Sequence, residues 1–124
     1  MLTEEALTDS ILGAAIGAHK TLGPGLLESA YEECLCRELS LRQISYERQV
    51  DLPLKYKDVQ LDCGYRLDLV VEDKVIVELK CIERLLPIHH AQLMTYVRLA
   101  NKKVGLLINF NSPILKDGIV RRVL

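Results

Sequence analysis

Two carboxylates and a lysine interrupt a pair of otherwise apolar segments between Arg66 and Lys80. Asp68 lies in the first segment, and Glu78 and Lys80 lie in the second. Burying a charge without a partner costs several kcal/mol, so buried charges are usually paired or bind a metal ion. Carboxylate oxygens are ligands that hard divalent cations such as Mg²⁺ prefer. The three side chains therefore predict a metal site on this pair of segments.

The two acids are expected to lie on one face of a β-hairpin. Strands over residues 66–71 and 75–80, joined by a turn of residues 72–74, would place Asp68 directly opposite Glu78. Side chains paired in this way have Cβ atoms about 5 Å apart. Two carboxylates at that distance repel each other unless a cation lies between them. A two-residue turn would loosen the pairing.

Lys80 shares a face with Glu78, because alternate residues of a strand point to the same side. A lysine beside a metal ion can hold a phosphate oxygen or orient an attacking water, so the three groups suit hydrolysis of a phosphodiester. The alternative is a structural ion pair across the strands on a solvated face, which is common. Val70 and Ile76 argue against it, since a solvated face would carry polar residues at these positions.

The hydrophobic pattern predicts the elements that position these groups. Apolar residues spaced three or four apart predict helices over residues 3–22, 26–41 and 88–100, and a Gly-Pro-Gly segment separates the first two. Extended apolar or alternating segments predict strands over residues 46–54, 59–63, 66–71, 75–80, 104–110 and 118–124. The order ααβββ(β)αβ(β) predicts an α/β fold, with a mixed β-sheet flanked by helices.

Length and charge limit the classes of function. A chain of 124 residues is expected to form a single domain over 1–124, and it contains no apolar run that could span a membrane. The acidic N-terminus lacks the layout of a signal peptide, so we expect a cytoplasmic protein. A formal net charge of −1 argues against a protein that coats nucleic acid by charge alone. The same charge is compatible with a nuclease.

Asp68 followed by Glu78-Leu79-Lys80 resembles the signature of the PD-(D/E)xK nuclease superfamily, although Leu67 replaces the proline that usually precedes the aspartate. The segment GLLESAY over 25–31 is similar to the motif of the GxxExxY family, small bacterial and archaeal proteins within that superfamily. The segments EDKVIVELK, PIHHAQLMTYV and VGLLINF are also similar to that family's, in the same order. The resemblance covers nearly the whole chain. It implies a restriction-endonuclease-like core and a nuclease using Mg²⁺, or Mn²⁺ as a substitute.

The resemblance also implies roles at the metal site. Lys80 would be a catalytic residue together with Asp68 and Glu78. The metal ligands would be Asp68, Glu78, the Leu79 carbonyl and Glu28. Glu28 matches the acid of the family's motif and lies on the inward stripe of the second predicted helix. An acid in the first turn of a helix can also serve only to offset the helix dipole, and spacing alone does not separate these two roles.

Four further residues are predicted to support catalysis or contact nucleic acid. Gln92 and Tyr96 form a QxxxY pattern that resembles a motif of exonuclease-type members of the superfamily. By that resemblance, Gln92 contacts Lys80 or a water at the metal, and Tyr96 contacts the nucleic-acid backbone. His89 lies one turn before Gln92, and Arg66 flanks the site, so either could reach a phosphate. The alternative for the Gln/Tyr pair is a polar edge on an amphipathic helix.

Two other functions fit the same residues. The chain could be a catalytically silent nuclease-fold module that binds nucleic acid or a protein partner, because it has no basic cluster interleaved with aromatic residues. It could also be a junction-resolving endonuclease that acts as a dimer. A terminal edge strand would make a homodimer feasible. The leading prediction is a Mg²⁺-dependent nuclease acting on DNA, with RNA as an alternative substrate.

Overall fold

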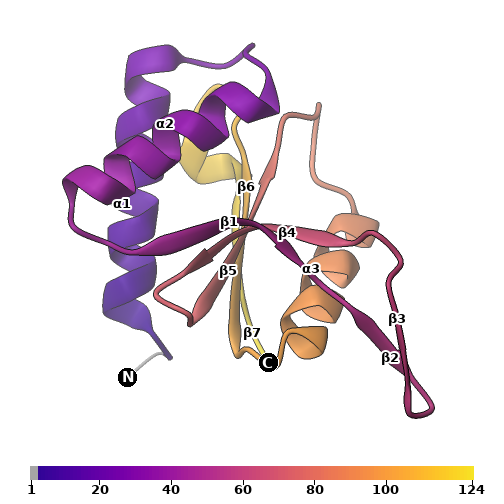
Figure 1. Ribbon diagram of the computed structural model, residues 1–124. Helices are drawn as coiled ribbons and strands as arrows, with labels where there is room; N and C mark the ends of the chain where they lie inside the picture. The colour runs from indigo at the N-terminus through magenta and orange to yellow at the C-terminus, as the bar shows by residue number, and fades with distance from the viewer. Residues whose placement is uncertain (1–2) are drawn as a thin grey trace.

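The computed structural model describes residues 3–124 and has a five-stranded mixed sheet at its centre (Figure 1). The strand order in this sheet is β1-β4-β5-β6-β7, and a separate two-stranded sheet consists of β2 and β3. The elements are α1 (Glu5–Leu22), α2 (Glu28–Leu41), β1 (Tyr46–Asp51), β2 (Leu54–Tyr56), β3 (Val59–Leu61), β4 (Arg66–Val71), β5 (Val75–Lys80), α3 (Pro87–Leu99), β6 (Val104–Asn109), the short 3₁₀ helix η1 (Leu115–Gly118) and β7 (Ile119–Val123).

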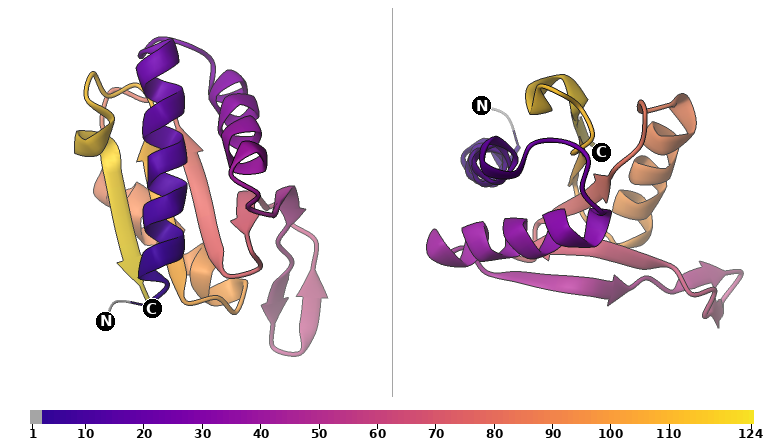
Figure 2. Two further views of the ribbon diagram at one scale, coloured as in Figure 1. Left: turned by 90° about the vertical axis from the view of Figure 1, so that its left-hand side faces the viewer. Right: turned by 90° about the horizontal axis from the view of Figure 1, so that it is seen from above.

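Helices cover both faces of the main sheet. α1 and α2 pack on one face and α3 on the other, as the views in Figures 1 and 2 show together. Strand β6 is buried at every residue, and β5 is buried as far as Leu79, which explains their nearly continuous apolar sequences. α3 approaches β6 closely at Gly105, where a Cβ atom would lie 2.7 Å from Val97 Cγ2. The predicted α/β arrangement of a mixed sheet flanked by helices is confirmed.

The predicted hairpin is confirmed with its bounds. β4 and β5 are antiparallel, and Val71 pairs with Val75 across a turn of the three residues 72–74. β5 and β6 are parallel, because the chain crosses over through α3 between them. The carboxyl end of β5 therefore lies beside α3. None of the helices within residues 3–124 is long and apolar enough to cross a membrane.

The prediction of one strand over residues 46–54 is wrong at its C-terminal end. β1 ends at Asp51, and Pro53, which has no N–H group to donate to a ladder, separates it from β2. β2 pairs with β3 through a two-residue turn, Lys57-Asp58, whose φ angles of 47° and 69° are typical of tight hairpins. A strand over residues 59–63 was predicted, so β3 corresponds to it and β2 is the additional strand. We call residues 54–61 the arm, because they project away from the sheet (Figures 1 and 2).

Candidate metal and catalytic site

Asp68 and Glu78 lie where β4 and β5 separate. The regular β-pairing of this hairpin ends at the pair Leu69 and Val77. Beyond this pair, main-chain N–H groups donate to side-chain carboxylates in place of main-chain carbonyls. Glu78 Oε1 accepts a hydrogen bond from the Asp68 N–H at 3.2 Å, and Asp68 Oδ2 accepts one from the Leu79 N–H at 2.8 Å. The two carboxylates are thereby fixed across the gap between the strands, as the three-residue turn predicts.

The surroundings of Asp68 and Glu78 make it unfavourable for both carboxyl groups to be ionised at once. Glu78 is buried, with 7% of its surface exposed, and Asp68 is half-buried. Burial and then the neighbouring Asp68 charge raise the pKa of Glu78 to about 8. Burial also raises the pKa of Asp68, although the hydrogen bond from the Leu79 N–H lowers it. Two neighbouring acids with raised pKa values in one site are typical of functional sites.

Glu28 and Lys80 approach this pair from two different elements. Glu28 is the first residue of α2, and Lys80 is the last residue of β5. Burial first, and then the charge of Asp68, raises the pKa of Glu28, while Lys80 lowers it. Lys80 is half-buried and forms no ion pair among residues 3–124. The structure therefore brings together three carboxylates and one ammonium group.

Tyr31 holds the loop that leads to Glu28 at the start of α2. Its ring is fully buried and stacks on Phe110, with ring centroids 4.6 Å apart. Its hydroxyl donates a hydrogen bond to the Gly23 carbonyl and accepts one from the Leu26 N–H at 3.2 Å. Gly25, between them, has a φ angle of 102° that favours glycine. Gly25 and Tyr31 thus shape the turn immediately before Glu28.

Sequence reasoning missed Glu32, a buried acid one helical turn after Glu28. Its carboxylate accepts hydrogen bonds at 2.8 Å from both Arg48 Nη2 and Gln49 Nε2. Neighbouring residues of a regular strand point to opposite faces, but Gln49 has a φ angle of 51° and both side chains reach Glu32. The charge of Glu32 also contributes to raising the pKa values of Asp68 and Glu28. Its spacing of four from Glu28 was the signal available in the sequence.

Tyr96 and Gln92 lie on the other side of the pair, on α3. Burial and then the charge of Glu78 raise the pKa of Tyr96, while a side-chain hydrogen bond with Gln92 lowers it. The Tyr96 ring centroid lies 6.1 Å from that of Tyr65, next to β4. Tyr96 is half-buried and Gln92 is exposed. The structure thus places Tyr96 within electrostatic reach of the two acids.

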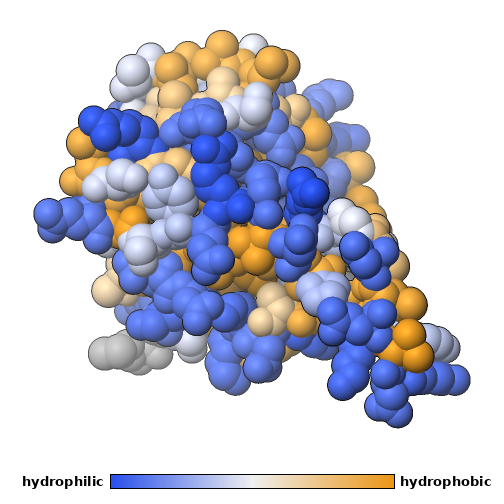
Figure 3. All heavy atoms as spheres, in the orientation of Figure 1, coloured by the Kyte–Doolittle hydropathy of each residue, from blue (hydrophilic) through white to orange (hydrophobic). Residues whose placement is uncertain are grey.

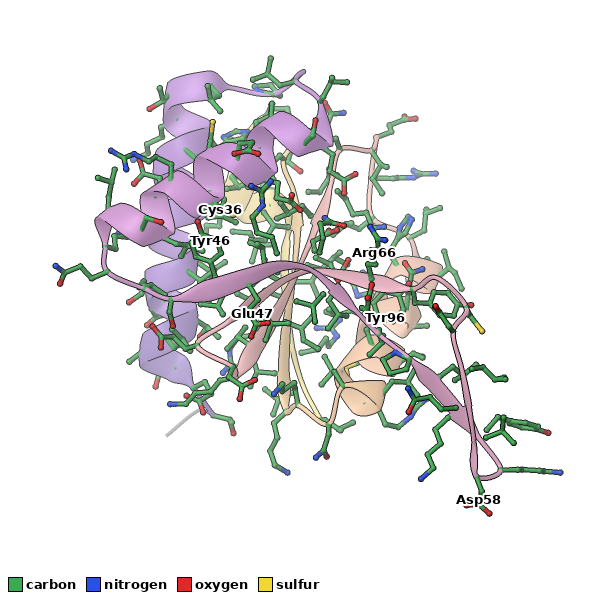
Figure 4. The ribbon with its side chains drawn as sticks, in the orientation of Figure 1. Cys36, Tyr46, Glu47, Asp58, Arg66 and Tyr96 are labelled. Carbon is green, nitrogen blue, oxygen red and sulfur yellow. The ribbon has the colours of Figure 1, made fainter. Side chains whose placement is uncertain are left out.

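Two predicted contact residues have other partners. His89 Nδ1 accepts a hydrogen bond at 2.8 Å from the Leu86 N–H, which closes the first turn of α3. Arg66 is exposed at the start of β4 (Figure 4) and forms an ion pair with Asp51, with 3.3 Å between Nε and Oδ1. His89 thus has a structural role that accounts for its position. Contact of either residue with nucleic acid stays a prediction.

The donor set suits a hard divalent ion. Asp68 Oδ1 and Glu78 Oε2 accept no main-chain hydrogen bond within residues 3–124, so the backbone engages only one oxygen of each carboxylate. No group of three or more His, Cys, Asp or Glu side chains in that part of the chain forms a complete metal-binding cluster. An ion held by this pair would therefore complete its shell with water and main-chain oxygen. Oxygen-rich, partly hydrated shells are typical of Mg²⁺.

Comparison with known proteins agrees with this geometry. A family model described as the PD-(D/E)XK nuclease superfamily matches residues 5–123. That span includes every residue of the site, and the helices and mixed sheet are those of a restriction-endonuclease-like fold. No curated protein and no solved structure matches the chain.

Proposed function

We propose that this chain, which belongs to the PD-(D/E)XK nuclease superfamily, is a nuclease that hydrolyses phosphodiester bonds in DNA with the help of a divalent ion. Its superfamily suggests nuclease activity, and members typically use divalent metal ions. The observation that carries the proposal is the pair of acids, buried Glu78 and half-buried Asp68, where β4 and β5 separate. Each carboxylate accepts a hydrogen bond from a main-chain N–H of the opposite strand. Such a pair is costly unless a cation or a proton neutralises it.

The metal ligands would be Asp68 and Glu78, with the Leu79 carbonyl as a third donor and Glu28 acting through a water. Mg²⁺ is the expected ion, and Mn²⁺ would substitute for it. When bound, the ion would polarise the phosphate and lower the pKa of a water molecule. Glu28 is the exposed first residue of α2 and directly follows the loop that Tyr31 fixes, so it can orient a water at the site.

Lys80 would be the main catalytic side chain of the protein itself. Its ammonium group lies beside the carboxylates and has no competing ion pair among the described residues, so it can stabilise negative charge developing on the phosphate. Gln92 would contact Lys80 or the water, and Tyr96 the nucleic-acid backbone. His89 and Arg66 would contribute weaker contacts to phosphate.

Within the superfamily, we propose membership in the GxxExxY family. Gly25, Glu28 and Tyr31 match that motif, and each contributes differently, since Gly25 adopts a positive φ angle, Tyr31 holds the loop, and Glu28 faces the acids. The motif would thus be a device for presenting one carboxylate to the metal site.

A cleavage assay tests the proposal. Purified protein is mixed with labelled linear, nicked, single-stranded or branched DNA, or with RNA, in Mg²⁺, Mn²⁺ or EDTA. Glu78→Ala and Lys80→Ala are compared with Asp73→Ala and Lys74→Ala, matched changes at the exposed turn between the same strands. We expect metal-dependent cutting by the wild type and both turn variants, and none by the site variants.

Each other outcome selects a different function. Cutting that survives Glu78→Ala and Lys80→Ala would come from a contaminant and would refute the site. If Mn²⁺ binds but nothing is cut, the chain is a module that binds nucleic acid or a partner. A strong preference for branched DNA would identify a junction-resolving enzyme.

A further inference from the structure

Gln49 has a backbone conformation that is unusual for its place in the fold. Its φ angle of 51° lies in the left-handed region, which residues other than glycine adopt rarely and at a cost. The other non-glycine residues with positive φ angles within residues 3–124 lie in turns or beside helix ends. Gln49 alone lies inside a strand, β1. Strained positions persist only where the surrounding structure holds them, and they cluster at functional sites.

Gln49 lies opposite Asp68 on the neighbouring strand, β4. The pairs that flank them share one register: Arg48 with Leu69, and Val50 with Leu67. No residue is therefore inserted in either strand, yet Gln49 and Asp68 do not form a regular pair. The strained residue of β1 thus stands directly across from an acid of the candidate metal site.

Both strands change face at this point. In a regular strand, residues two or four apart point to the same side of the sheet. On β4, however, Leu69 packs in the core that contains residues of α1 and α2, whereas Leu67 packs in the core that contains residues of α3. On β1, Tyr46 packs against the first of these cores and Val50 against the second. The left-handed residue lets β1 follow the turn that β4 makes at Asp68.

A contact with Glu32 on α2 holds Gln49 in this conformation. β1 is an edge strand of the main sheet, with β4 as its neighbour, and its residues 47–49 are exposed. Figure 3 shows hydrophilic side chains over much of the side of the molecule on which β1 lies. α2 runs beside β1 (Figures 1 and 2), and Gln49 Nε2 donates a hydrogen bond of 2.8 Å to Glu32 Oε1.

The carboxylate of Glu32 is itself fixed. Its other oxygen, Oε2, accepts a hydrogen bond of 2.8 Å from Arg48 Nη2, and the residue is only 7% exposed. Glu32 cannot turn away from Gln49 without leaving a buried acceptor unpaired, which is costly. An ion pair with Arg48 alone would not require a left-handed residue in the strand.

We infer that Gln49, held by Glu32, is a positioning residue for Asp68, because its left-handed backbone turns the two paired strands so that the Asp68 carboxylate meets Glu78. The inference rests on the proposed function, in which Asp68 is a metal ligand. The position of the Asp68 carboxylate can also be followed without a metal ion, through the hydrogen bond of 2.8 Å that its Oδ2 accepts from the Leu79 N–H.

Two substitutions separate the backbone of Gln49 from its side chain. Gln49→Ala removes the contact with Glu32 and leaves a residue that avoids positive φ angles, whereas Gln49→Gly removes the same contact but adopts such angles readily. Amide hydrogen exchange in EDTA follows the Leu79 N–H. We expect exchange about tenfold faster than in the wild type for Gln49→Ala, and within about threefold of the wild type for Gln49→Gly. Titration calorimetry should show the same order, with about tenfold weaker Mn²⁺ binding for Gln49→Ala.

Glu47→Ala and Glu47→Gly are the matched controls. Glu47 is exposed on the same strand (Figure 4) and has no positive φ angle. Both variants should match the wild type in Leu79 exchange and in Mn²⁺ affinity. The glycine variant should be the less stable of the two, because glycine weakens a regular strand. Circular dichroism and thermal unfolding verify that all four variants fold.

The outcomes separate this inference from the proposed function. If Gln49→Gly behaves like Gln49→Ala or worse, the Gln49 side chain only ties β1 to α2, and the inference is overturned. Wild-type behaviour of Gln49→Ala would overturn it as well. If the wild type binds no Mn²⁺, the proposed function fails, and the exchange rates at Leu79 still decide whether Gln49 positions Asp68.

Discussion

At the residue scale, the main-chain hydrogen bonds of Asp68 and Glu78 determine how their carboxylates meet. Each accepts a hydrogen bond from the backbone at the opposite strand, so neither can turn away without leaving an N–H group unpaired. The electrostatic repulsion is therefore built into the hairpin. Without a metal ion, a proton is the remaining way to neutralise it.

This repulsion should make the metal-free protein less stable as the pH rises. Glu78 has a pKa of about 8 in the folded protein, against about 4.5 for an ordinary glutamate, so between these values the folded state holds a proton that the unfolded chain has released. Stability conferred by that proton is lost as pH rises through this window. In EDTA, we expect the unfolding free energy of the wild type to fall by a few kcal/mol between pH 5 and 8, relative to Glu78→Gln.

Chemical denaturation at several pH values measures this difference. The amide introduced by Glu78→Gln keeps an acceptor for the Asp68 N–H but cannot ionise, so the profile of that variant should be flatter. Asp73→Asn is the control: Asp73 is exposed, and Lys102 lowers its pKa, so its removal should not flatten the fall. Equal slopes for the wild type and Glu78→Gln would contradict the raised pKa.

At the element scale, the loop between α1 and α2 depends on one hydroxyl group. Tyr31→Phe keeps the ring stacked on Phe110 but removes the hydrogen bonds to Gly23 and Leu26. We expect a loss of about 1 kcal/mol in unfolding free energy. Because the loop presents Glu28, we also expect weaker Mn²⁺ binding, measured by titration calorimetry.

Tyr46→Phe is the matched control for this change. Its hydroxyl forms an exposed hydrogen bond with Ser40 at the far end of α2, remote from Glu28. It should leave Mn²⁺ binding unchanged. If Tyr31→Phe binds Mn²⁺ like the wild type, the loop does not position a metal ligand.

The closeness of α3 to the sheet depends on Gly105. A Cβ atom there would lie 2.7 Å from Val97 Cγ2 and 2.9 Å from Leu93 Cδ1, so α3 would have to move outward. Gly105→Ala should destabilise the protein by about 1–3 kcal/mol, as overpacked cores do. Gly17→Ala, in the middle of α1, has only flexible side chains near it and should be neutral or stabilising. Thermal unfolding compares the two, and equal stability of both variants would contradict this packing.

The sequence predicts an element well when residues within that element determine it, and poorly when distant residues do. The β4–β5 hairpin follows from two apolar segments joined by a short turn, so its bounds were predictable. Because side chains alternate between the faces of a strand, the position of Asp68 opposite Glu78 was predictable as well. The arm was not, because whether Pro53 ends a strand or lies at its edge depends on the sheet around it. The Glu32 contacts require a positive φ angle at Gln49, which the sequence does not indicate.

At the scale of the whole molecule, positive and negative charges nearly balance. The chain has 16 basic and 17 acidic residues, and several cations are already used in ion pairs with Glu32, Glu38, Asp51 and Asp73. The chain therefore has no net positive charge with which to attract a phosphate backbone. Substrate binding should rely on a few contacts near the metal site.

The salt dependence of DNA binding measures how few these contacts are. Each phosphate contact contributes about −0.9 to the slope of log affinity against log salt, so we expect a slope of about −2 to −4 for duplex DNA. Fluorescence anisotropy with the Glu78→Gln protein, which should bind without cutting, gives this slope. Arg66→Ala should reduce its magnitude by about one unit, whereas Lys116→Ala, on η1, should not change it. A slope steeper than about −7 would require a basic surface that a net charge of −1 and the existing ion pairs do not provide.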